Sequence, residues 1–542
     1  MSGLINDSLR TFIAYGIRVT GLLTTLAQRI RIAGFHRRQQ QLRVRYAIDD
    51  QTPVLSYGRE IVALINQAVA GVDGQVQFAL TSGSTGTPKR ILFTKSRLRS
   101  LKLTFTDFFV RCCWAFSLRR TSLYVFSSLI HDQSLTSMLL SETRLPLYFS
   151  TLQAPYRVQS HPALRRLAST YGATAVRLWV LVIANPGVIY STNPSTISTF
   201  LDDLATRWQS SSKLVRDWHY QPQIFDKSLH RIARRLCARG AAGRIARIAR
   251  SEKPLSLEGC APAVATYICW TGGYVQPFLK RLATYLPPNR YRLIPMYSMS
   301  TETVETVGCI NGKSVTFVPL ALDVHYEFIP ESEDDLPSKI LQPAQLQVGQ
   351  TYSLIVSDNY GLRRYQTADL FLCEGKLSGL PQLTFVRRKN LEYSFTGEKL
   401  TEQQVHSAFQ SLRDDIPELA LDFMTVVPSQ PADESVPHYK LVIVSESQHR
   451  SEASSEQIAQ RCDEILAEIN CEYKSKRESG RLGPVRLVCA DPNSFARKLH
   501  GKDASSWETQ FKFLPLYRQT WESGTMSPAH SIQCQTVSTV TR

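Results

Sequence analysis

A loop of hydroxyl side chains, glycines and one lysine is the part of this sequence best suited to chemistry. Residues 81–89 read T-S-G-S-T-G-T-P-K, directly after the short apolar stretch 78–80, which predicts a strand. Glycines let backbone N–H groups turn toward a phosphate, hydroxyls add donors, and the lysine adds a mobile positive charge. The sequence therefore predicts a phosphate-binding loop that ends at Lys89.

This loop differs from the common loop of nucleotide hydrolases. The Walker loop requires a glycine directly before its lysine and a Ser or Thr directly after it. Pro88 and Arg90 occupy those two places here, and a helical pattern begins near Lys95. The usual nucleotide-hydrolase chemistry is therefore excluded for this loop.

The composition indicates a large globular protein with an unusual charge. The chain has 542 residues, of which 43% are hydrophobic and 20% are charged, so most of it should fold into one large and at least one smaller domain. The net charge of +17 favours ATP, pyrophosphate or an acidic substrate. The same field would also favour nucleic acid or an anionic membrane surface.

The basic excess is concentrated in residues 227–253, where arginines alternate with Ile and Leu at helical spacing. This pattern predicts a pair of surface helices with an apolar face on the core and a solvated basic face. RNA or membrane contact remains an alternative, although no aromatic side chains alternate with the arginines to stack on bases.

The ends of the chain and the cysteines carry further expectations. Residues 12–27 are apolar but carry Arg18, so we expect an amphipathic helix and no membrane span, and a transit peptide stays open. The Ser/Thr-rich tail 522–542 should be disordered. Eleven cysteines without metal spacing predict buried thiols in a reducing compartment and no zinc site.

Between the ends, strand and helix patterns alternate and predict a layered α/β core. Residues 122–127, 177–183 and 352–356 are expected to be strands, and Asn193 is expected to cap a helix over 194–208. The acidic stretch 330–343 is expected to be an exposed loop, because a strand pattern resumes after it.

Further segments identify a family. Residues 270–282 predict a strand end, a glycine turn and a helix, and S-T-E ends at Glu302. Later segments are Y-Q-T-A-D ending at Asp369, F-V-R-R-K-N over 385–390, S-F-T-G-E-K-L-T-E over 394–402, and G-K-D-A-S-S-W-E-T-Q-F-K ending at Lys512. In this order they resemble the Gretchen Hagen acyl acid-amido synthetases, the auxin-responsive branch of the adenylate-forming enzymes, roughly from Ser56 to Pro515.

This resemblance implies a role for each matching residue. Thr301 would contact the α phosphate of ATP, Glu302 would place Mg²⁺, and Asp369 would accept hydrogen bonds from the ribose hydroxyls. Arg387 would pair with ribose or phosphate, and Lys512 would reach the acyl phosphate, unless it is a surface lysine. The β and γ phosphates would be held by the loop residues Thr81, Ser82, Gly83, Ser84, Thr85, Gly86 and Lys89. The catalytic residues would be Lys89, Glu302 and Lys512.

The sequence departs from the family pattern at two places. Tyr297 lies one residue before the position expected for an adenine-stacking tyrosine, which is taken by Ser298. Ala368 replaces the glycine often found before the ribose-binding aspartate, a change expected to be mild.

The resemblance also implies an α/β fold of several layers, with a mobile α+β C-terminal domain. We expect a basic helical segment over 1–50, an adenylation domain over 51–393, a mobile domain over 394–517 hinged at Gly397, and a tail over 518–542.

The implied reaction consumes ATP with Mg²⁺, activates a small carboxylic acid and passes it to an amine or amino acid. A coenzyme A or carrier thioester ligase is the alternative, and a catalytically weak, basic nucleic-acid-binding relative is a third. We expect a cytoplasmic monomer without a specific nucleic-acid partner, and place its acyl pocket near 129–140 or 190–195.

Overall fold

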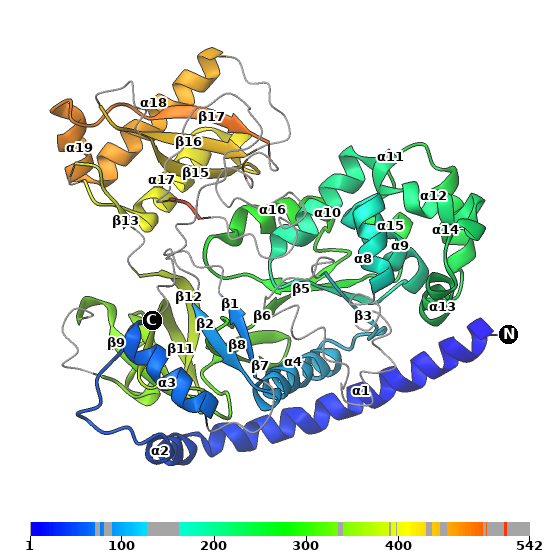
Figure 1. The fold of residues 1–542 in the computed structure, drawn as a ribbon, viewed down its shortest axis with the longest axis horizontal. Coiled ribbons are helices and arrows are strands. Elements are labelled where there is room, and N and C mark those ends of the chain that lie inside the picture. The colour runs from blue at the N-terminus through cyan, green and yellow to red at the C-terminus, as the bar shows by residue number, and fades with distance from the viewer. Residues whose placement is uncertain are drawn as a thin grey trace, which may run out of the picture. The chain divides into compact units, whose positions relative to one another are not determined.

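The structure is a computed structural model that describes residues 2–70, 76–80, 89–126, 162–333, 340–389, 392–396, 398–429, 436–444, 452–491, 495 and 514–517. The chain divides into two compact units, Met1–Lys389 and Asn390–Arg542 (Figure 1). The division falls after Lys389, a few residues before the boundary predicted after residue 393. The predicted N-terminal segment 1–50 lies within the first unit.

A parallel sheet forms the centre of unit 1. Its strands are β3 (Leu123–Val125), β4 (Val188–Tyr190), β5 (Thr266–Trp270) and β6 (Arg292–Met296), in that spatial order. Side chains alternate between the two faces of a strand, and both faces of this sheet are covered. In β4, for example, Val188 and Tyr190 enter one hydrophobic core while Ile189 enters the other. Glu302 follows β6, at the carboxyl edge of this sheet.

Helices of residues 162–285 pack on one face of the parallel sheet and share one hydrophobic core with it (Figure 1). The predicted helix over 194–208 is confirmed, since α10 begins at Pro194 and the Asn193 side chain accepts a hydrogen bond from the Ser195 N–H. The helices between residues 162 and 285 are α8 (Pro162–Tyr171), α9 (Ala173–Ala184), α10 (Pro194–Thr206), α11 (Trp208–Ser211), α12 (Lys213–Tyr220), α13 (Lys227–Leu236), α14 (Ala241–Arg250), α15 (Leu257–Cys260), α16 (Gln276–Tyr285), and the short 3-10 turns Pro222–Ile224 and Gly273–Val275.

The strand predicted over 177–183 is wrong. These residues belong to α9, in which every residue from Thr174 to Ala184 is buried. A continuous apolar run can form either a buried strand or a buried helix, because neither needs a polar face. The strands predicted near 122–127 and 352–356 are confirmed as β3 and β10 (Thr351–Ser357).

The other face of the parallel sheet packs on a core shared with antiparallel strands. Four of them form a sheet in the order β12-β11-β10-β9, and two hairpins, β1-β2 and β7-β8, pack beside it. The strands are β1 (Gln77–Leu80), β2 (Arg90–Phe93), β7 (Val307–Asn311), β8 (Ser314–Val318), β9 (His325–Pro330), β10, β11 (Tyr365–Leu377) and β12 (Leu380–Arg388). They are joined by helices α3 (Arg59–Ala70) and α4 (Lys95–Ala115) and by the 3-10 turns Glu331–Glu333 and Pro343–Gln345.

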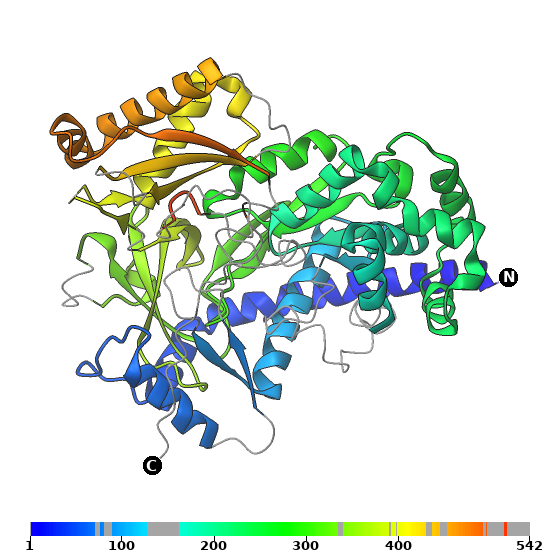
Figure 2. The ribbon, with the colours of Figure 1, turned by 45° about the horizontal axis from the view of Figure 1, so that its top comes forward.

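The chain begins with two helices, α1 (Ser2–Ala33) and α2 (Phe35–Arg45). Figures 1 and 2 show α1 running along α4. The two helices approach closely at Gly21, where an added Cβ would lie 2.1 Å from the backbone oxygen of Val110. Gln28 donates to the Gly308 carbonyl at 3.3 Å, and Arg31 pairs with Asp107 at 3.2 Å. The predicted N-terminal helix is thus confirmed and is an integral part of unit 1.

The basic segment folds as the sequence predicts, into two amphipathic surface helices. α13 buries Leu229, Ile232 and Leu236, and α14 buries Ile248. Arg244 is an exception to the solvated basic face, because it is buried and donates to the Val182 carbonyl near the end of α9. At least one arginine of this segment is therefore structural.

Unit 2 is built on a three-stranded sheet in the order β15-β16-β17, with helices packed on one face. Its elements are β13 (Glu392–Tyr393), β14 (Leu400–Thr401), α17 (Glu402–Asp415), the 3-10 turn Pro417–Leu419, β15 (Phe423–Ser429), β16 (His438–Val444), α18 (Glu452–Ile469), α19 (Cys471–Glu478) and β17 (Arg486–Ala490). The second face carries a smaller core that includes Phe495 and Tyr517.

Several predictions lie outside the described residues. They include the loop Thr81–Gly86, the acyl-pocket candidate 129–140, residues 334–339 of the loop 330–343, Gly397, Lys512 and the tail 518–542. No helix in the described part of the chain is long and apolar enough to cross a membrane.

Candidate active site

Lys89 stands at the end of the predicted phosphate loop because the strands on either side of that loop pair with each other. β1 and β2 form an antiparallel hairpin in which Leu80 lies opposite Arg90. The two ends of the loop are therefore adjacent, and Lys89 leads directly into β2. The Tyr57 hydroxyl accepts a hydrogen bond from the Arg90 N–H at 2.8 Å and anchors this end.

Glu302 meets Lys89 from the opposite side. It lies in a tight turn after β6, in which the Ser300 N–H donates to the Thr303 carbonyl at 3.0 Å. The Lys89 Nζ lies 3.2 Å from the Glu302 Oε1 and 2.8 Å from the Tyr365 hydroxyl. The Glu302 side chain is 5% exposed and that of Lys89 17%, so the lysine is the more open partner. Sequence analysis predicted both charged residues, and the structure brings them together across 213 residues.

A buried arginine that sequence analysis did not single out holds this arrangement. Arg97, in the first turn of α4, donates to the backbone carbonyls of Leu92 in β2 and Glu302. It also pairs with Asp358 at 3.5 Å. Arg97 thus links the strand that carries Lys89 to the turn that carries Glu302. One arginine among many at a helix start gives no sequence signal, because this role depends on the tertiary fold.

Asp369 is buried in β11 and lies opposite Arg388 in β12. The Arg388 Nε donates to the Asp369 Oδ1 at 2.7 Å, and the pKa of the Arg388 guanidinium is raised, chiefly by the charge of Asp369. Arg387, the predicted nucleotide-binding residue, pairs instead with Glu331. Neighbouring residues of a strand point to opposite faces, so only one arginine of the pair can face Asp369. Arg388, which sequence analysis did not single out, is therefore the partner of Asp369.

A second buried carboxyl lies beside Asp369. The pKa of Glu305 is raised well above its usual range by burial and by the charge of Asp369. Two adjacent buried carboxyls cannot both carry a charge at low cost, so this environment favours the protonated form of Glu305. The Ser298 hydroxyl donates to the Glu305 Oε2. The Lys89–Glu302 pair and the Asp369–Arg388 pair also interact electrostatically. The charge of Glu302 contributes to the raised pKa of Arg388 and to that of Tyr365, which contacts Lys89.

Ala368 adopts a backbone conformation that favours glycine. Its φ is +64°, in the left-handed region, where a Cβ crowds the following carbonyl. The Ala368 carbonyl accepts a hydrogen bond from the Lys389 N–H at 2.7 Å, next to Asp369. An alanine at this position therefore carries backbone strain that a glycine would not.

Tyr297 and Thr301, two other residues considered in the sequence analysis, are buried or half-buried. Tyr297 is 2% exposed, and its ring packs edge-on against Phe108 with the centroids 5.4 Å apart. Its ring is thus part of the core. Thr301 is half-buried and lines a cavity of about 20 Å³ beside Arg97 and Asp358. Such a cavity has room for about one water molecule.

In unit 2, the S-F-T-G-E-K-L-T-E segment has a structural role. Glu398 is fully buried, and its carboxylate accepts hydrogen bonds from the backbone N–H groups of Phe395 and Thr396 and from the Tyr439 hydroxyl. Thr401 caps α17 through a capping box with Gln404. The hydrogen bonds of this motif, which helped to identify the family, thus stabilise the start of unit 2.

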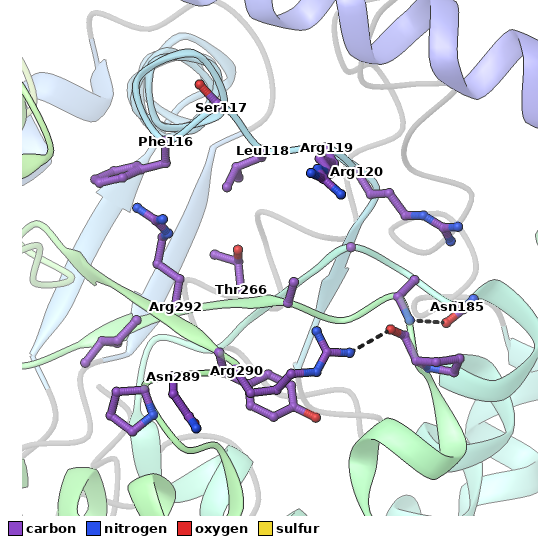
Figure 3. Close-up of a pocket in the computed structure, with 17 residues that line it drawn as sticks. Phe116, Ser117, Leu118, Arg119, Arg120, Asn185, Thr266, Asn289, Arg290 and Arg292 are labelled. Atoms are coloured by element: carbon purple, nitrogen blue, oxygen red, sulfur yellow. Dashed lines mark hydrogen bonds between the residues drawn. The ribbon is translucent and has the colours of Figure 1, made fainter.

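A hollow of about 810 Å³ lies on the opposite edge of the parallel sheet, and Figure 3 shows the side chains that line it. Its lining residues precede β3, β4, β5 and β6 or lie in the first residues of β5 and β6, so it lies at the amino ends of these strands. Four arginines surround it, Arg119, Arg120, Arg290 and Arg292, and Arg290 pairs with Glu258 at 3.1 Å. Ligands of α/β sheets bind at the carboxyl ends of the strands. We therefore do not assign this hollow to the Lys89–Glu302 site.

Comparisons with known proteins agree with this geometry. Domains described as GH3 family N-terminal, central and C-terminal match residues 68–290, 317–388 and 401–519. The fold is similar to that of the AtGH3.15 acyl acid amido synthetase in complex with 2,4-DB, with a TM-score of 0.64 and 15% identity over 86% of this chain and 85% of that one.

The curated relatives match a smaller part of this chain. Indole-3-acetic acid-amido synthetase GH3.4 of Arabidopsis thaliana is 24% identical over 230 residues, which are 40% of this chain and 38% of that protein. Jasmonoyl-L-amino acid synthetase JAR4 of Nicotiana attenuata is 26% identical over 251 residues, which are 44% of this chain and 42% of that protein. The matched regions thus span about two-fifths of these relatives. The three matched domains, in family order across most of the chain, show that this chain belongs to the GH3 family, the Gretchen Hagen family that its motifs predict.

Proposed function

We propose that this chain is an ATP-dependent ligase that activates a small carboxylic acid as its acyl-adenylate and transfers the acyl group to an amine or amino acid. The observation that carries the proposal is the Lys89–Glu302 pair, at the end of the phosphate loop in a chain of the GH3 family. The named relatives are amido synthetases of indole-3-acetic acid and jasmonate, and a benzoate–glutamate ligase is a further one.

The first step requires stabilisation of charge. A carboxylate oxygen of the acid attacks the α phosphorus of ATP, and the bond to the β phosphate breaks with release of pyrophosphate. Lys89 would neutralise charge on the departing oxygens together with the donors of Ser82, Ser84 and Thr85. Lys89 is half-buried between Glu302 and Tyr365, so it is oriented before ATP arrives.

Mg²⁺ fits the same site. Glu302 offers a hard carboxylate oxygen next to Lys89, and Mg²⁺ in nucleotide sites is held by one or two carboxylates and by substrate phosphates. When bound, the ion would neutralise charge on the phosphate oxygens. Glu302 would hold it, and Lys89 would shift from Glu302 toward the phosphates.

Asp369 would bind the ribose hydroxyls, and Arg388 would orient its carboxylate. Thr301 would contact the α phosphate and Lys512 the acyl phosphate. In the second step the amine attacks the acyl carbonyl, loses a proton and releases AMP, so no protein nucleophile is required.

We further propose that the protein acts as a monomer in the cytoplasm. All ten cysteines of the described residues are free thiols, which fits a reducing compartment. Burial raises the pKa of Cys260, Cys309 and Cys462 to about 12, so these thiols stay protonated and unreactive.

A product assay tests the choice of acceptor. The purified protein is incubated with ATP, Mg²⁺ and a panel of aromatic, fatty and hydroxy acids, with either pooled amino acids or coenzyme A. We expect an amide in the mass spectrum with amino acids and no thioester with coenzyme A. Thioester formation without an amide from any amine would replace the proposal with an acyl-thioester ligase.

A further inference from the structure

The first helix has a second apolar face that no described element covers. Between residues 15 and 30 its large exposed hydrophobic side chains are Tyr15, Val19, Leu22, Leu23, Leu26 and Ile30. At about 100° per residue, these six positions fall within an arc of about 100° and form one continuous stripe along about 22 Å of helix. We call them the outer stripe. Tyr15, Leu23 and Ile30 are 69%, 60% and 75% exposed.

The inner face of the helix accounts for its packing in the fold. Ala14, Ile17, Gly21 and Gln28 are buried and lie on the side of the helix opposite the outer stripe. Gln28 is held between the Arg111 guanidinium and the Gly308 carbonyl. Because the inner face already anchors α1, the outer stripe is not needed for the packing of unit 1.

The charge around the outer stripe has one sign. Residues 8–48 contain eight arginines and no acidic residue. Arg18 and Arg29 lie along one border of the stripe, and no acidic side chain among the described residues pairs with either. The matched GH3 domains begin at residue 68, so the stripe lies outside the family's matched core.

We propose that the outer stripe docks on an anionic lipid bilayer surface, with α1 parallel to that surface. An amphipathic helix with an apolar stripe and bordering arginines binds in this way, because its apolar side chains enter the boundary with the acyl chains while the arginines meet the headgroups. The helix is too polar to span a bilayer, in agreement with the absence of a spanning helix among the described residues.

Two other partners fit the observations less well. A second copy of the chain would bring like charges together along the stripe, since this region holds no acidic residue that could pair with the arginines. A protein groove that encloses a helix would require α1 to leave α4, where Gly21 lies against the backbone of Val110. A flat anionic surface needs only the exposed face.

The test is a co-sedimentation assay of the full chain with vesicles of phosphatidylcholine containing about 30% phosphatidylserine, and with pure phosphatidylcholine vesicles. Leu23→Ser with Ile30→Ser removes stripe surface, and Arg18→Gln with Arg29→Gln removes border charge. The matched control is Ile224→Ser with Val348→Ser, two exposed apolar residues that are not part of α1. Tyr15→Trp adds a fluorescent reporter, and circular dichroism melting checks the fold of each variant.

We expect the wild type and the control pair to bind the anionic vesicles, and the stripe pair to bind at least about tenfold more weakly. The arginine pair should bind more weakly and with a smaller salt dependence, and the tryptophan emission should shift to the blue on binding. Failure of the wild type to bind at low salt would overturn the proposal, as would unchanged binding by the stripe pair. A wild-type dimer that the stripe pair abolishes would assign the stripe to a second copy instead.

Discussion

At the scale of single residues, Ala368 shows how a local conformation bears on the site. Its left-handed φ costs about 1 kcal/mol for a residue with a Cβ. Ala368→Gly should remove that strain, and the greater freedom of glycine in the unfolded chain offsets about half of the gain. We expect the urea midpoint of unfolding to rise slightly.

Ala368→Val provides the matched comparison, because a β-branched side chain is less tolerated at positive φ. It should lower the midpoint by more than the glycine raises it. A higher midpoint for the valine variant together with a lower midpoint for the glycine variant would show that the position does not adopt this conformation in solution.

Tyr365 is a second residue whose effect can be measured. Its hydroxyl receives a hydrogen bond from Lys89 at 2.8 Å, and a bond to a charged group contributes about 1.5–3 kcal/mol. Tyr365→Phe should lower acid-dependent ATP–pyrophosphate exchange about tenfold, because Lys89 would be less well oriented. The thermal melting temperature is the control, and an early-melting variant with normal exchange would assign Tyr365 a purely structural role.

At the scale of elements, the packing of α1 on α4 gives a sharp pair of variants. Gly21→Ala places a Cβ 2.1 Å from the Val110 carbonyl oxygen and 2.7 Å from the Trp114 Cβ, so the helices must separate. Gly16 lies in the same helix, and an added Cβ there would have no neighbouring atom within 4 Å. Gly21→Ala should lower the melting temperature, and Gly16→Ala should raise it slightly through better helix propensity.

Equal melting temperatures for the two glycine variants would mean that α1 does not pack on α4. The same result would favour the alternative of a detachable transit segment. The pair therefore tests an element of the fold and the nature of the N-terminus together.

The helix α17 carries a pH-dependent contribution to stability. Burial, with a contribution from Arg413, lowers the pKa of His406 to about 4. The unfolded chain has a histidine pKa near 6.5, so it binds the proton preferentially between about pH 6.5 and pH 4. Stability is thus full above about pH 6.5 and falls as the pH drops toward 4, by about 2 kcal/mol at pH 5.

Urea unfolding at pH 7 and pH 5 measures this loss. His406→Leu should reduce the difference in unfolding free energy between the two pH values. An unchanged difference in the variant would show that other groups, and not His406, cause the acid sensitivity.

The elements also show what the sequence could and could not predict. Helix α10 was predictable because Asn193 and Pro194 form a local start signal. Helix α9 was misassigned because its apolar run has no exposed face, and strand β2 was missed because four residues after a loop give little pattern. Local signals fix an element only where its two faces differ in polarity.

At the site, the residues that bear charge in recognisable motifs were predictable, and those that position them were not. Lys89 and Glu302 came from motifs, and the structure pairs them. Arg388 was not predicted as the partner of Asp369, because only the strand pairing decides which arginine faces that carboxylate. Arg97 depends on contacts between segments 205 residues apart, which no local pattern records.

At the scale of the whole molecule, the chain belongs to the GH3 family and consists of two units with separate cores. The proposed chemistry depends mainly on unit 1, which carries Lys89, Glu302 and Asp369. The basic helices α13 and α14 lie in the same unit but use Arg244 to hold the end of α9.

The most direct test of the central claim is ATP–pyrophosphate exchange that depends on an added carboxylic acid. The wild type, Lys89→Ala and the control Lys313→Ala are compared, since Lys313 is an exposed lysine in the turn between β7 and β8. The account predicts exchange by the wild type and the control, and about a hundredfold loss in Lys89→Ala, as for removal of one charge contact in the transition state. Equal exchange in Lys89→Ala and wild type, with both proteins folded, would contradict the account.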